Sequence, residues 1–207
     1  MKIFKAVAIL ALPFAVLTSC AKIFYSPDAR SLANRQQTIA ILPANISIAA
    51  SKKIDAEAMR EQQKTESLNF QKEIYSWMLK RKMQGKLTQE IQDLETTITK
   101  LQRAGYPENS LTTAELCEVL GVDGIMTSSF ALSRPMSEGA AIAIGLLAGA
   151  WGTTNEVRTS LSISDCMNKK LIWNYEHKLS GSIGSSPARI VDQLMRQASL
   201  KMPYIND

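Results

Sequence analysis

A single histidine, His177, limits the acid–base chemistry that this chain of 207 residues can perform. Hydrolysis through a covalent intermediate needs a nucleophile, a base beside it and an acid that orients the base. No G-x-S-x-G motif precedes His177, which lies in a segment of alternating polar and apolar residues near Tyr175. This setting is typical of a half-exposed strand histidine, so the sequence predicts no enzymatic activity.

Carboxylates gather at two places where paired acids would suit proton transfer. Glu115, Glu118 and Asp123 form one group, and Glu90 and Asp93 form the other. A helix cap and a turn account for the first group, and the polar face of a helix accounts for the second. We therefore predict structural roles for these carboxylates.

Motifs for cofactors and metals are missing from the sequence as well. Residues 181–186, GSIGSS, precede a predicted helix, but they lack the lysine of a P-loop. The three cysteines and the single histidine form no C-x-x-C or Cys/His pattern with metal spacing. The sequence therefore predicts neither a cofactor nor a metal.

The first twenty residues indicate where the protein works. Lys2 and Lys5 give a positively charged start, and residues 6–17 form an apolar run of the length found in secretory signal peptides. This run is shorter than the ~20 residues of a membrane-spanning helix, and Pro13 disfavours a buried helix. Residues 1–19 are therefore predicted to be a signal peptide.

The tetrapeptide Leu17-Thr18-Ser19-Cys20, at the end of this run, resembles the lipobox of bacterial lipoproteins. The resemblance implies cleavage before Cys20, diacylation of its thiol and acylation of its new amino group, with palmitate as a typical chain. Ala21 stands where an aspartate would retain the protein at the inner membrane, so the enteric sorting rule implies the outer membrane, facing the periplasm. Two or more acyl chains anchor a protein stably.

Charge and the remaining cysteines are compatible with that location. Loss of residues 1–19 leaves 22 of the 24 basic residues against 19 acidic ones, an excess too small to indicate nucleic-acid binding. Cys117 and Cys166 remain, either as two partly buried thiols or as a disulfide, which an oxidising periplasm permits. The sequence alone leaves both alternatives open.

Periodicity predicts the elements in the first half of the mature chain. Residues 20–37 lack it and are predicted to be a lipidated tether, whereas residues 38–44, TIAILPA, indicate a buried strand. Residues 45–54 are predicted to be a loop or a short extension. An extended helical region follows over 55–104, and its second helix carries an apolar stripe, which predicts packing on its own domain or an intermolecular helix pair. The stripe consists of Leu87, Ile91, Leu94, Ile98 and Leu101.

The second half of the chain predicts a helix, a strand, a hairpin and a final helix. Residues 112–121 begin with a Thr-Thr-Ala-Glu capping box and end at a glycine. A strand over 122–133 and a hairpin of 156–165 with 171–181 follow, and residues 186–198 form a helix that starts with Ser-Pro. This order predicts an α+β fold, a mixed α/β sandwich with a sheet of about four strands covered by helices.

Three segments together resemble a known superfamily: TIAILPA at 38–44, LCEVLGVDGIMTSSF at 116–130 and SLSISDCMNKKLIWNYE at 160–176. Their order is similar to that in curli-secretion lipoproteins, the N-terminal domain of TolB and the lipoproteins that activate peptidoglycan synthases. The resemblance implies one domain over 38–203 that binds other proteins rather than catalyses a reaction. In a curli-type pore, each membrane-crossing hairpin needs two segments of ~10 residues in which polar and apolar residues alternate. The sequence does not show the four such segments that two hairpins would need.

An apolar insertion, GAAIAIGLLAGAWG at 139–152, separates two predicted strands and is too short to span a membrane as a straight helix. Three interpretations stay open: a buried core segment, a loop at the membrane interface, and a self-association surface built on G-x-x-x-G. The candidate contact residues are Ile142, Ile144, Gly145, Leu146, Leu147, Gly149 and Trp151.

The sequence thus predicts a non-enzymatic, lipid-anchored envelope protein that docks on an envelope partner or on its own copies. The insertion and the helices of 55–104 are the expected docking surfaces. The alternative is a subunit of an oligomeric outer-membrane secretion channel of the curli-secretion type. A weaker alternative, a small-ligand or glycan site at Trp173 and Tyr175, competes with burial of both side chains in the core.

Overall fold

The computed structural model describes residues 21–49, 55–133, 156–180 and 186–206. The predicted signal peptide, the predicted lipidation site Cys20 and all seven candidate contact residues of the insertion lie outside these ranges. Within the described ranges, no helix is long and apolar enough to cross a membrane.

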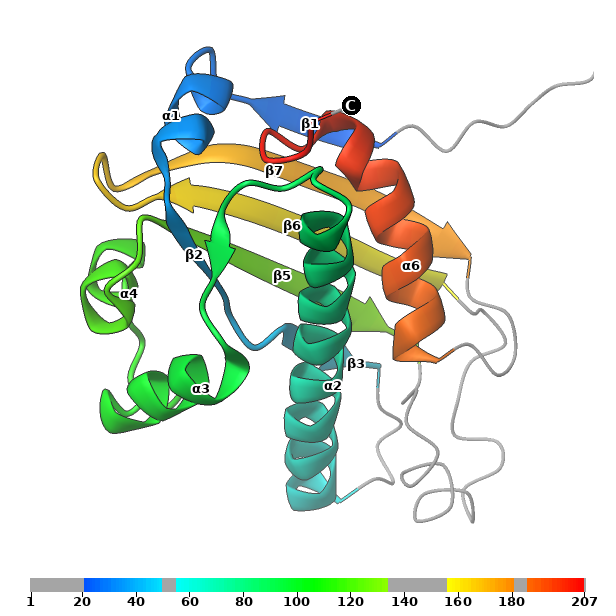
Figure 1. Cartoon of the computed structure of the whole chain (residues 1–207). Helices are drawn as coiled ribbons and strands as arrows, with labels where there is room; N and C mark the ends of the chain where they lie inside the picture. Colours follow the sequence, from blue (N-terminus) through cyan, green and yellow to red (C-terminus); the bar gives the residue numbers. More distant parts are fainter. Residues whose placement is uncertain (1–20, 50–54, 134–155, 181–185, 207) are drawn as a thin grey trace, which may run out of the picture.

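A mixed sheet of seven strands organises the described residues (Figure 1). Along the path β1-β7-β6-β5 neighbouring strands are antiparallel, whereas β2 and β3 pair in parallel with β5, one after the other along its length. The strands are β1 (Lys22–Tyr25), β2 (Thr38–Ile41), β3 (Asn45–Ile48), β4 (Glu90–Ile91), β5 (Gly124–Leu132), β6 (Glu156–Asp165) and β7 (Lys170–Ser180). The predicted α+β class is confirmed, with more strands than the four expected.

Five α-helices accompany this sheet in the described part of the chain, and four of them have a side-chain cap at the N-terminus. Asp55 caps the first turn of the longest helix, and Thr112 and Glu115 form the predicted capping box. Gly121 ends that short helix with φ of 62°, a left-handed conformation that suits glycine. The helices are α1 (Ala29–Arg35), α2 (Ala56–Met83), α3 (Leu94–Arg103), α4 (Thr113–Leu120) and α6 (Pro187–Ala198).

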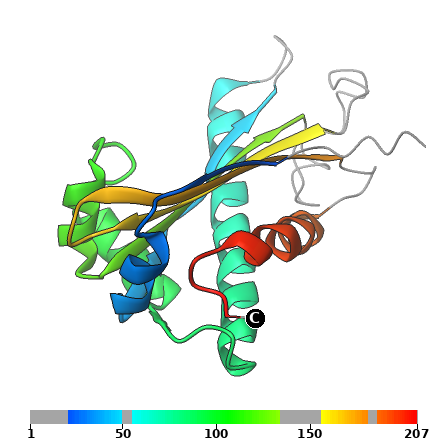
Figure 2. The same ribbon diagram turned by 90° about the horizontal axis from the view of Figure 1, so that it is seen from above.

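The main core lies between one face of the sheet and helices α2 and α6, which lie side by side across it (Figure 1). Figure 2 shows the sheet close to edge-on, with α1 and α6 on the same side of it. Phe70 of α2 stacks on Phe130 of β5, with ring centroids 4.0 Å apart. Alternate residues of β6, including Leu161 and Ile163, are fully buried here, as the period of two in a strand requires.

The predicted tether is wrong for most of its length, because residues 22–35 belong to the fold. Strand β1 pairs with β7 in the register Lys22↔Glu176 to Tyr25↔Trp173. Helix α1 then buries Ala29, Leu32 and Ala33 in the main core. Four strand residues and seven helical residues are too few to show a period, and all of β1 is exposed, so no apolar alternation marks it.

The extended helical region is interrupted, and the predicted stripe helix is only half helical. Helix α3 begins at Leu94, where the Asp93 carboxylate accepts a hydrogen bond from the Thr96 N–H. Ile91 instead lies in β4, opposite Ile39 of β2. The apolar residues of the stripe thus belong in turn to a buried position at Leu87, to strand β4 and to helix α3. Their spacing is compatible with this succession as well as with one helix, so periodicity alone placed the start of the helix too early. A two-heptad helix pair through this stripe is excluded.

Two further local predictions need correction. Residues 45–54 were expected to be a loop or a short extension, but Asn45–Ile48 forms β3 and buries Ile46 and Ile48. In the hairpin, a bulge between Ile163 and Ser164 shifts the register with β7. As a result Ile172 is buried and Leu171 is 42% exposed, whereas unbroken alternation with the buried Trp173 and Tyr175 would bury Leu171.

Candidate functional site on the open face of the sheet

The second face of the sheet is covered over only part of its length. Helices α3 and α4 pack on the end formed by β2 and the start of β5, where Ala40, Leu42 and Ile125 meet Leu101 and Leu116 in a second, smaller core. The Cys117–Cys166 disulfide ties α4 to the residue that follows β6. No described element covers the remaining part, which we call the open face.

Hydroxyl, amide and charged side chains line most of the open face, with Ala131 and Phe24 as apolar exceptions. Alternation places them opposite the core residues of the same strands. They are Asn45 and Ser47 of β3, Thr127, Ser129 and Ala131 of β5, Arg158, Ser160, Ser162 and Ser164 of β6, Asn174, Glu176 and Lys178 of β7, and Lys22 and Phe24 of β1. Hydroxyl and amide groups form hydrogen bonds with water as readily as with protein groups, so this surface is stable in water without a covering element.

The strand register aligns these side chains into rows that cross the sheet. One row runs from Asn45 through Ser129, Ser160 and Glu176 to Lys22. Directly opposed residues in a sheet have Cβ atoms about 4.5–5.5 Å apart, so each row is a continuous strip of hydrogen-bonding groups. An extended surface of this kind suits a partner that makes many hydrogen bonds, rather than one small ligand held in a deep site.

Hydrogen bonds within the open face fix part of this surface. The Asn174 side-chain oxygen accepts hydrogen bonds from the Ser162 hydroxyl at 2.9 Å and from the Ser160 hydroxyl at 3.3 Å. The Asn174 amide nitrogen donates to Glu176 Oε1 at 3.3 Å. These contacts link β6 to β7, and they leave the Ser129 hydroxyl of β5 without a side-chain partner among those that the described residues provide.

The open face is hollowed toward the end where β5 and β6 lead into the insertion. A cavity of about 700 Å³ there is lined by the charged residues Lys22, Arg158, Glu176 and Lys178, together with Ser47, Ser129, Ser160 and neighbours. A smaller hollow of about 230 Å³ adjoins Tyr106 and Pro43, where the cover by α3 and α4 ends. The open face is therefore a shallow, polar depression next to a partly apolar rim.

Charges at the hollowed end are largely paired. Glu156 accepts from Arg158 Nε at 2.8 Å and lies 2.6 Å from Lys178 Nζ, and these contacts, with Lys178 first, lower the pKa of the Glu156 carboxyl. His177 lines the cavity from β7, and burial lowers the pKa of its imidazole. The imidazole is thus neutral at neutral pH, and its buried Nδ1 has no hydrogen-bond partner among the described residues.

Glu115 and Asp123 serve the fold, as predicted, whereas the helix face predicted for Glu90 and Asp93 is wrong, because Glu90 lies in β4 and Asp93 caps α3. Asp123 accepts hydrogen bonds at 2.9 Å from the backbone N–H groups of Gln37 and Thr38, which begin β2. Glu115 completes the capping box by accepting from the Thr112 N–H at 2.7 Å. These contacts lower the pKa of Glu115, so that group is ionised and unsuited to act as a general acid.

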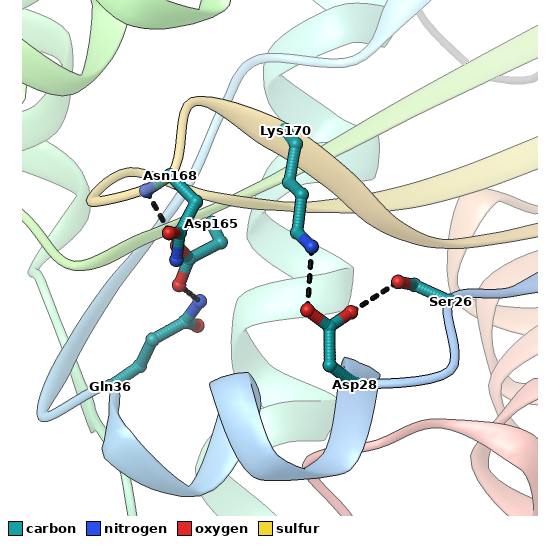
Figure 3. A network of polar contacts seen from close by, with 6 residues as sticks. All are labelled: Ser26, Asp28, Gln36, Asp165, Asn168 and Lys170. Atoms are coloured by element: carbon teal, nitrogen blue, oxygen red, sulfur yellow. Dashed lines mark hydrogen bonds and ion pairs between the residues drawn. The ribbon is translucent and has the colours of Figure 1, made fainter.

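A buried polar network joins α1 to the hairpin turn (Figure 3). Asp165 accepts from Gln36 Nε2 at 2.8 Å and from the backbone and side-chain nitrogens of Asn168 at 2.8 and 2.6 Å. The Tyr204 hydroxyl donates to Gln36 Oε1, and burial raises the pKa of Tyr204 well above its usual value. The Gly124 backbone lies so close that an added Cβ would overlap both Gln36 Oε1 and the Tyr204 hydroxyl.

Other sequence candidates are placed as follows. Trp173 and Tyr175 are buried in the main core, so the weaker alternative of a ligand site on these aromatic side chains is wrong. Cys117 and Cys166 form a disulfide, which settles the alternative that the sequence left open. Among the described residues, no cluster of three metal-ligating side chains occurs. Sequence reasoning did not single out the open face, although serines at 160, 162 and 164 between apolar residues signalled it.

No protein-family model matches the chain, and no curated protein matches it in sequence. Several solved structures have a similar fold at low identity. The PelC dodecamer from Paraburkholderia phytofirmans is 9% identical, with a TM-score of 0.45 over 91% of this chain and 99% of that chain. Lipoprotein GNA1162 from Neisseria meningitidis is 10% identical, with a TM-score of 0.41 over 79% and 94%. The LpoB C-terminal domain from Escherichia coli is 11% identical, with a TM-score of 0.36 over 74% and 96%. These likenesses concern the fold alone.

Proposed function

We propose that this protein is a non-enzymatic, lipid-anchored protein of the bacterial envelope that docks on a partner protein at the periplasmic side of the outer membrane. The observation that carries the proposal is the open face. Two helices cover one part of this side of the sheet with an apolar core, whereas the rest carries small polar groups around a cavity of about 700 Å³. Non-obligate protein interfaces have this polar character, because each partner must also be stable alone.

Two features support the envelope as the compartment. The lipobox at residues 17–20 follows an apolar run of signal-peptide length. The Cys117–Cys166 disulfide matches an oxidising compartment, since such bonds are rare in reducing cytosol. A disulfide and a lipobox are independent features of the chain, and both fit a secreted, anchored protein.

Lipidation is tested first, by the mass of the mature protein extracted from membranes. We expect a chain that begins at Cys20 and carries acyl groups, whereas Cys20→Ala should leave residues 1–19 attached. A mature wild-type chain without acyl groups would contradict the anchored part of the proposal. Ser19→Ala, which keeps the acylated cysteine, serves as a control for general effects on export.

Docking through the open face is tested by photo-crosslinking in intact cells. A photoreactive residue at Ser129 should give an adduct of defined mass with an envelope protein, and the same residue at the exposed Lys72 of α2 should not. Ser160→Arg puts a long cation in the same row, so it should abolish the Ser129 adduct. Equal adducts at both positions, or none at Ser129, would contradict docking at this face.

The second candidate function is a subunit of an oligomeric secretion channel, in which Ile142 to Trp151 contact lipid or other copies. One observation favours it: the insertion connects β5 to β6, which are antiparallel and paired up to Leu132↔Val157. A lipid-facing hairpin would need such a connection. Light scattering of residues 21–207 with and without detergent tests it. A ring, or an aggregate that detergent dissolves, supports the channel, whereas a monomer in both conditions contradicts it.

A further inference from the structure

Strand β1 exposes three consecutive large side chains, Ile23, Phe24 and Tyr25, with 42%, 49% and 40% of their surface accessible. It is also the terminal strand of the sheet on the side of β7, so among the described residues one of its backbone edges has no strand partner. Natural sheets usually protect such an edge with charges, proline or a bulge. A run of apolar side chains on an open edge therefore indicates contact with something else.

Exposed large apolar side chains elsewhere do not form such a group. Leu68 and Met83 lie far apart on α2, Met167 lies in the hairpin turn, Leu171 in β7 and Leu200 in the turn after α6. Scattered exposed apolar residues are ordinary on protein surfaces and require no partner. The β1 group is distinguished because its members are adjacent and come from both sides of one strand.

The chain that precedes β1 indicates what covers it. Only Ala21 separates Lys22 from Cys20, the residue proposed to carry the acyl chains. An extended chain advances at most ~3.3–3.6 Å per residue, so Phe24 lies within about 14 Å of the anchored residue. The fold thus begins immediately at the anchor, and β1 is the first described element that the membrane surface meets.

The chemistry of β1 suits the headgroup layer rather than the hydrocarbon core. Free backbone N–H and C=O groups at the strand edge need water or headgroups as partners, which hydrocarbon does not supply. Aromatic side chains are favoured at the interface, and Lys22 adds a cation that anionic headgroups attract. Glu176, which lies opposite Lys22 in the register, offsets part of that attraction, so the apolar side chains must supply most of the contact.

We propose that Ile23, Phe24 and Tyr25 of β1 form a membrane-contact strip that holds the sheet edge against the lipid headgroup layer beside the acylated Cys20. This inference rests on the proposed lipid anchor and adds an orientation to it. With β1 at the membrane, the anchor does not act as a long flexible tether. The open face then has a fixed direction relative to the bilayer instead of sampling all directions.

The test uses the full lipidated chain in vesicles of phosphatidylethanolamine and phosphatidylglycerol. Phe24→Cys and, as a matched control, Leu68→Cys of α2 are each labelled with an environment-sensitive nitrobenzoxadiazole dye. Leu68 is 38% exposed and lies on a helix that crosses the opposite part of the sheet. We expect several-fold weaker quenching by aqueous iodide at position 24 than at position 68, together with quenching at position 24 by a lipid-borne spin label.

Each outcome decides the question. Equal iodide quenching at the two positions would overturn the membrane-contact strip while leaving the lipid anchor intact, provided that the mass shows acyl groups on Cys20. The same measurement is made in detergent micelles, where the bilayer is absent. Weak iodide quenching at position 24 there, together with a doubled protein mass per particle, would overturn the membrane-contact strip in favour of a second copy paired through β1. A mature chain without acyl groups would remove both proposals.

Discussion

The two faces of the same strands differ sharply in chemistry. In β6, Leu161 and Ile163 are fully buried against α2 and α6, whereas Ser160 and Ser162 between them lie on the open face. A strand presents successive side chains to opposite sides, so one ten-residue segment supplies both a core and a surface. The comparison indicates that in β6 the buried face holds the main core, and that side chains on the open face can change with little effect on the fold.

A second comparison concerns the covered and open parts of the second face. On β5, Ile125 is covered by α3 and α4, but Thr127 and Ser129, further along on the same face, are not. The residue type changes from apolar to hydroxyl where the cover ends. Coverage and composition therefore agree, which indicates a surface built to be in water rather than a core that has lost a helix.

The largest expected effect separates adjacent residues of β5. Phe130→Ala removes a buried ring that stacks on Phe70 and should lower the free energy of unfolding by about 3–5 kcal/mol. Ser129→Ala, one residue away on the open face, should change it by less than ~0.5 kcal/mol. Urea denaturation of both variants checks the contrast, and comparable losses would show that the open face contributes to stability.

The disulfide belongs to the covered part of the second face, so its loss should also be costly. Cys117 and Cys166 are 49 residues apart in sequence, and closing a loop of that size stabilises by about 4 kcal/mol in the chain-entropy model. The double Cys→Ser variant should therefore unfold at lower denaturant concentration than the oxidised protein. Wild-type protein in reductant should match the variant, and an unchanged midpoint in reductant would contradict the prediction.

A smaller loss of stability is expected from a substitution at Gly124, where the main core meets the buried polar network. Gly124→Ala puts a methyl group against Gln36 Oε1 and the Tyr204 hydroxyl and should destabilise by about 1–3 kcal/mol through overpacking. Ala131→Ser, on the exposed side of the same strand, is the control and should be neutral within ~0.5 kcal/mol. Thermal unfolding of the two variants gives the comparison, and a neutral Gly124→Ala would mean that Tyr204 moves freely.

The smallest effect is a pH dependence at the surface contact between α1 and the hairpin. Lys170, at 2.6 Å, and the Ser26 hydroxyl lower the pKa of Asp28 from 3.8 to about 2. Because the folded-state pKa is depressed, the contact contributes fully above pH 3.8 and is lost as the pH falls through about 2. Carbon NMR titration of the Asp28 carboxyl should show this pKa.

Two lysine variants sharpen that measurement. Lys170→Met should return the Asp28 pKa toward 3.8, since its ammonium is the largest cause of the shift. Lys178→Met removes a lysine of the same strand that pairs with Glu156 instead, and it should leave Asp28 unchanged. An Asp28 pKa that responds equally to both substitutions would mean that general charge, and not the contact, sets it.

Much of the fold was predictable because its signals are local. Thr112 with Glu115 marks the start of α4, Gly121 marks its end, and Ser186 with Pro187 marks the start of α6. Alternation over ten residues likewise predicts β6 and its partner β7. In each case the hydrogen bonds or side-chain periods join residues close in sequence, so the sequence displays them directly.

The missed elements depend on contacts between distant segments. Strand β4 has two residues and exists because Glu90 and Ile91 pair with Thr38 and Ile39. Strand β1 forms because its backbone pairs with that of β7, although none of its side chains is buried. No pattern within two or four residues can indicate such pairing, because the stabilising partner lies 50 or 150 positions away.

The sequence by itself determined the helix caps, the hairpin, the α+β class and the position of a predicted lipid anchor. Only the tertiary structure decided that Cys117 meets Cys166, that Asp165 binds Gln36, and that β1 pairs with β7 at one end of the sheet. It also decided which half of the second face stays open, because coverage depends on where α3 and α4 pack. Local hydrogen bonds and periods are encoded in short segments, whereas covering a surface depends on how distant segments meet.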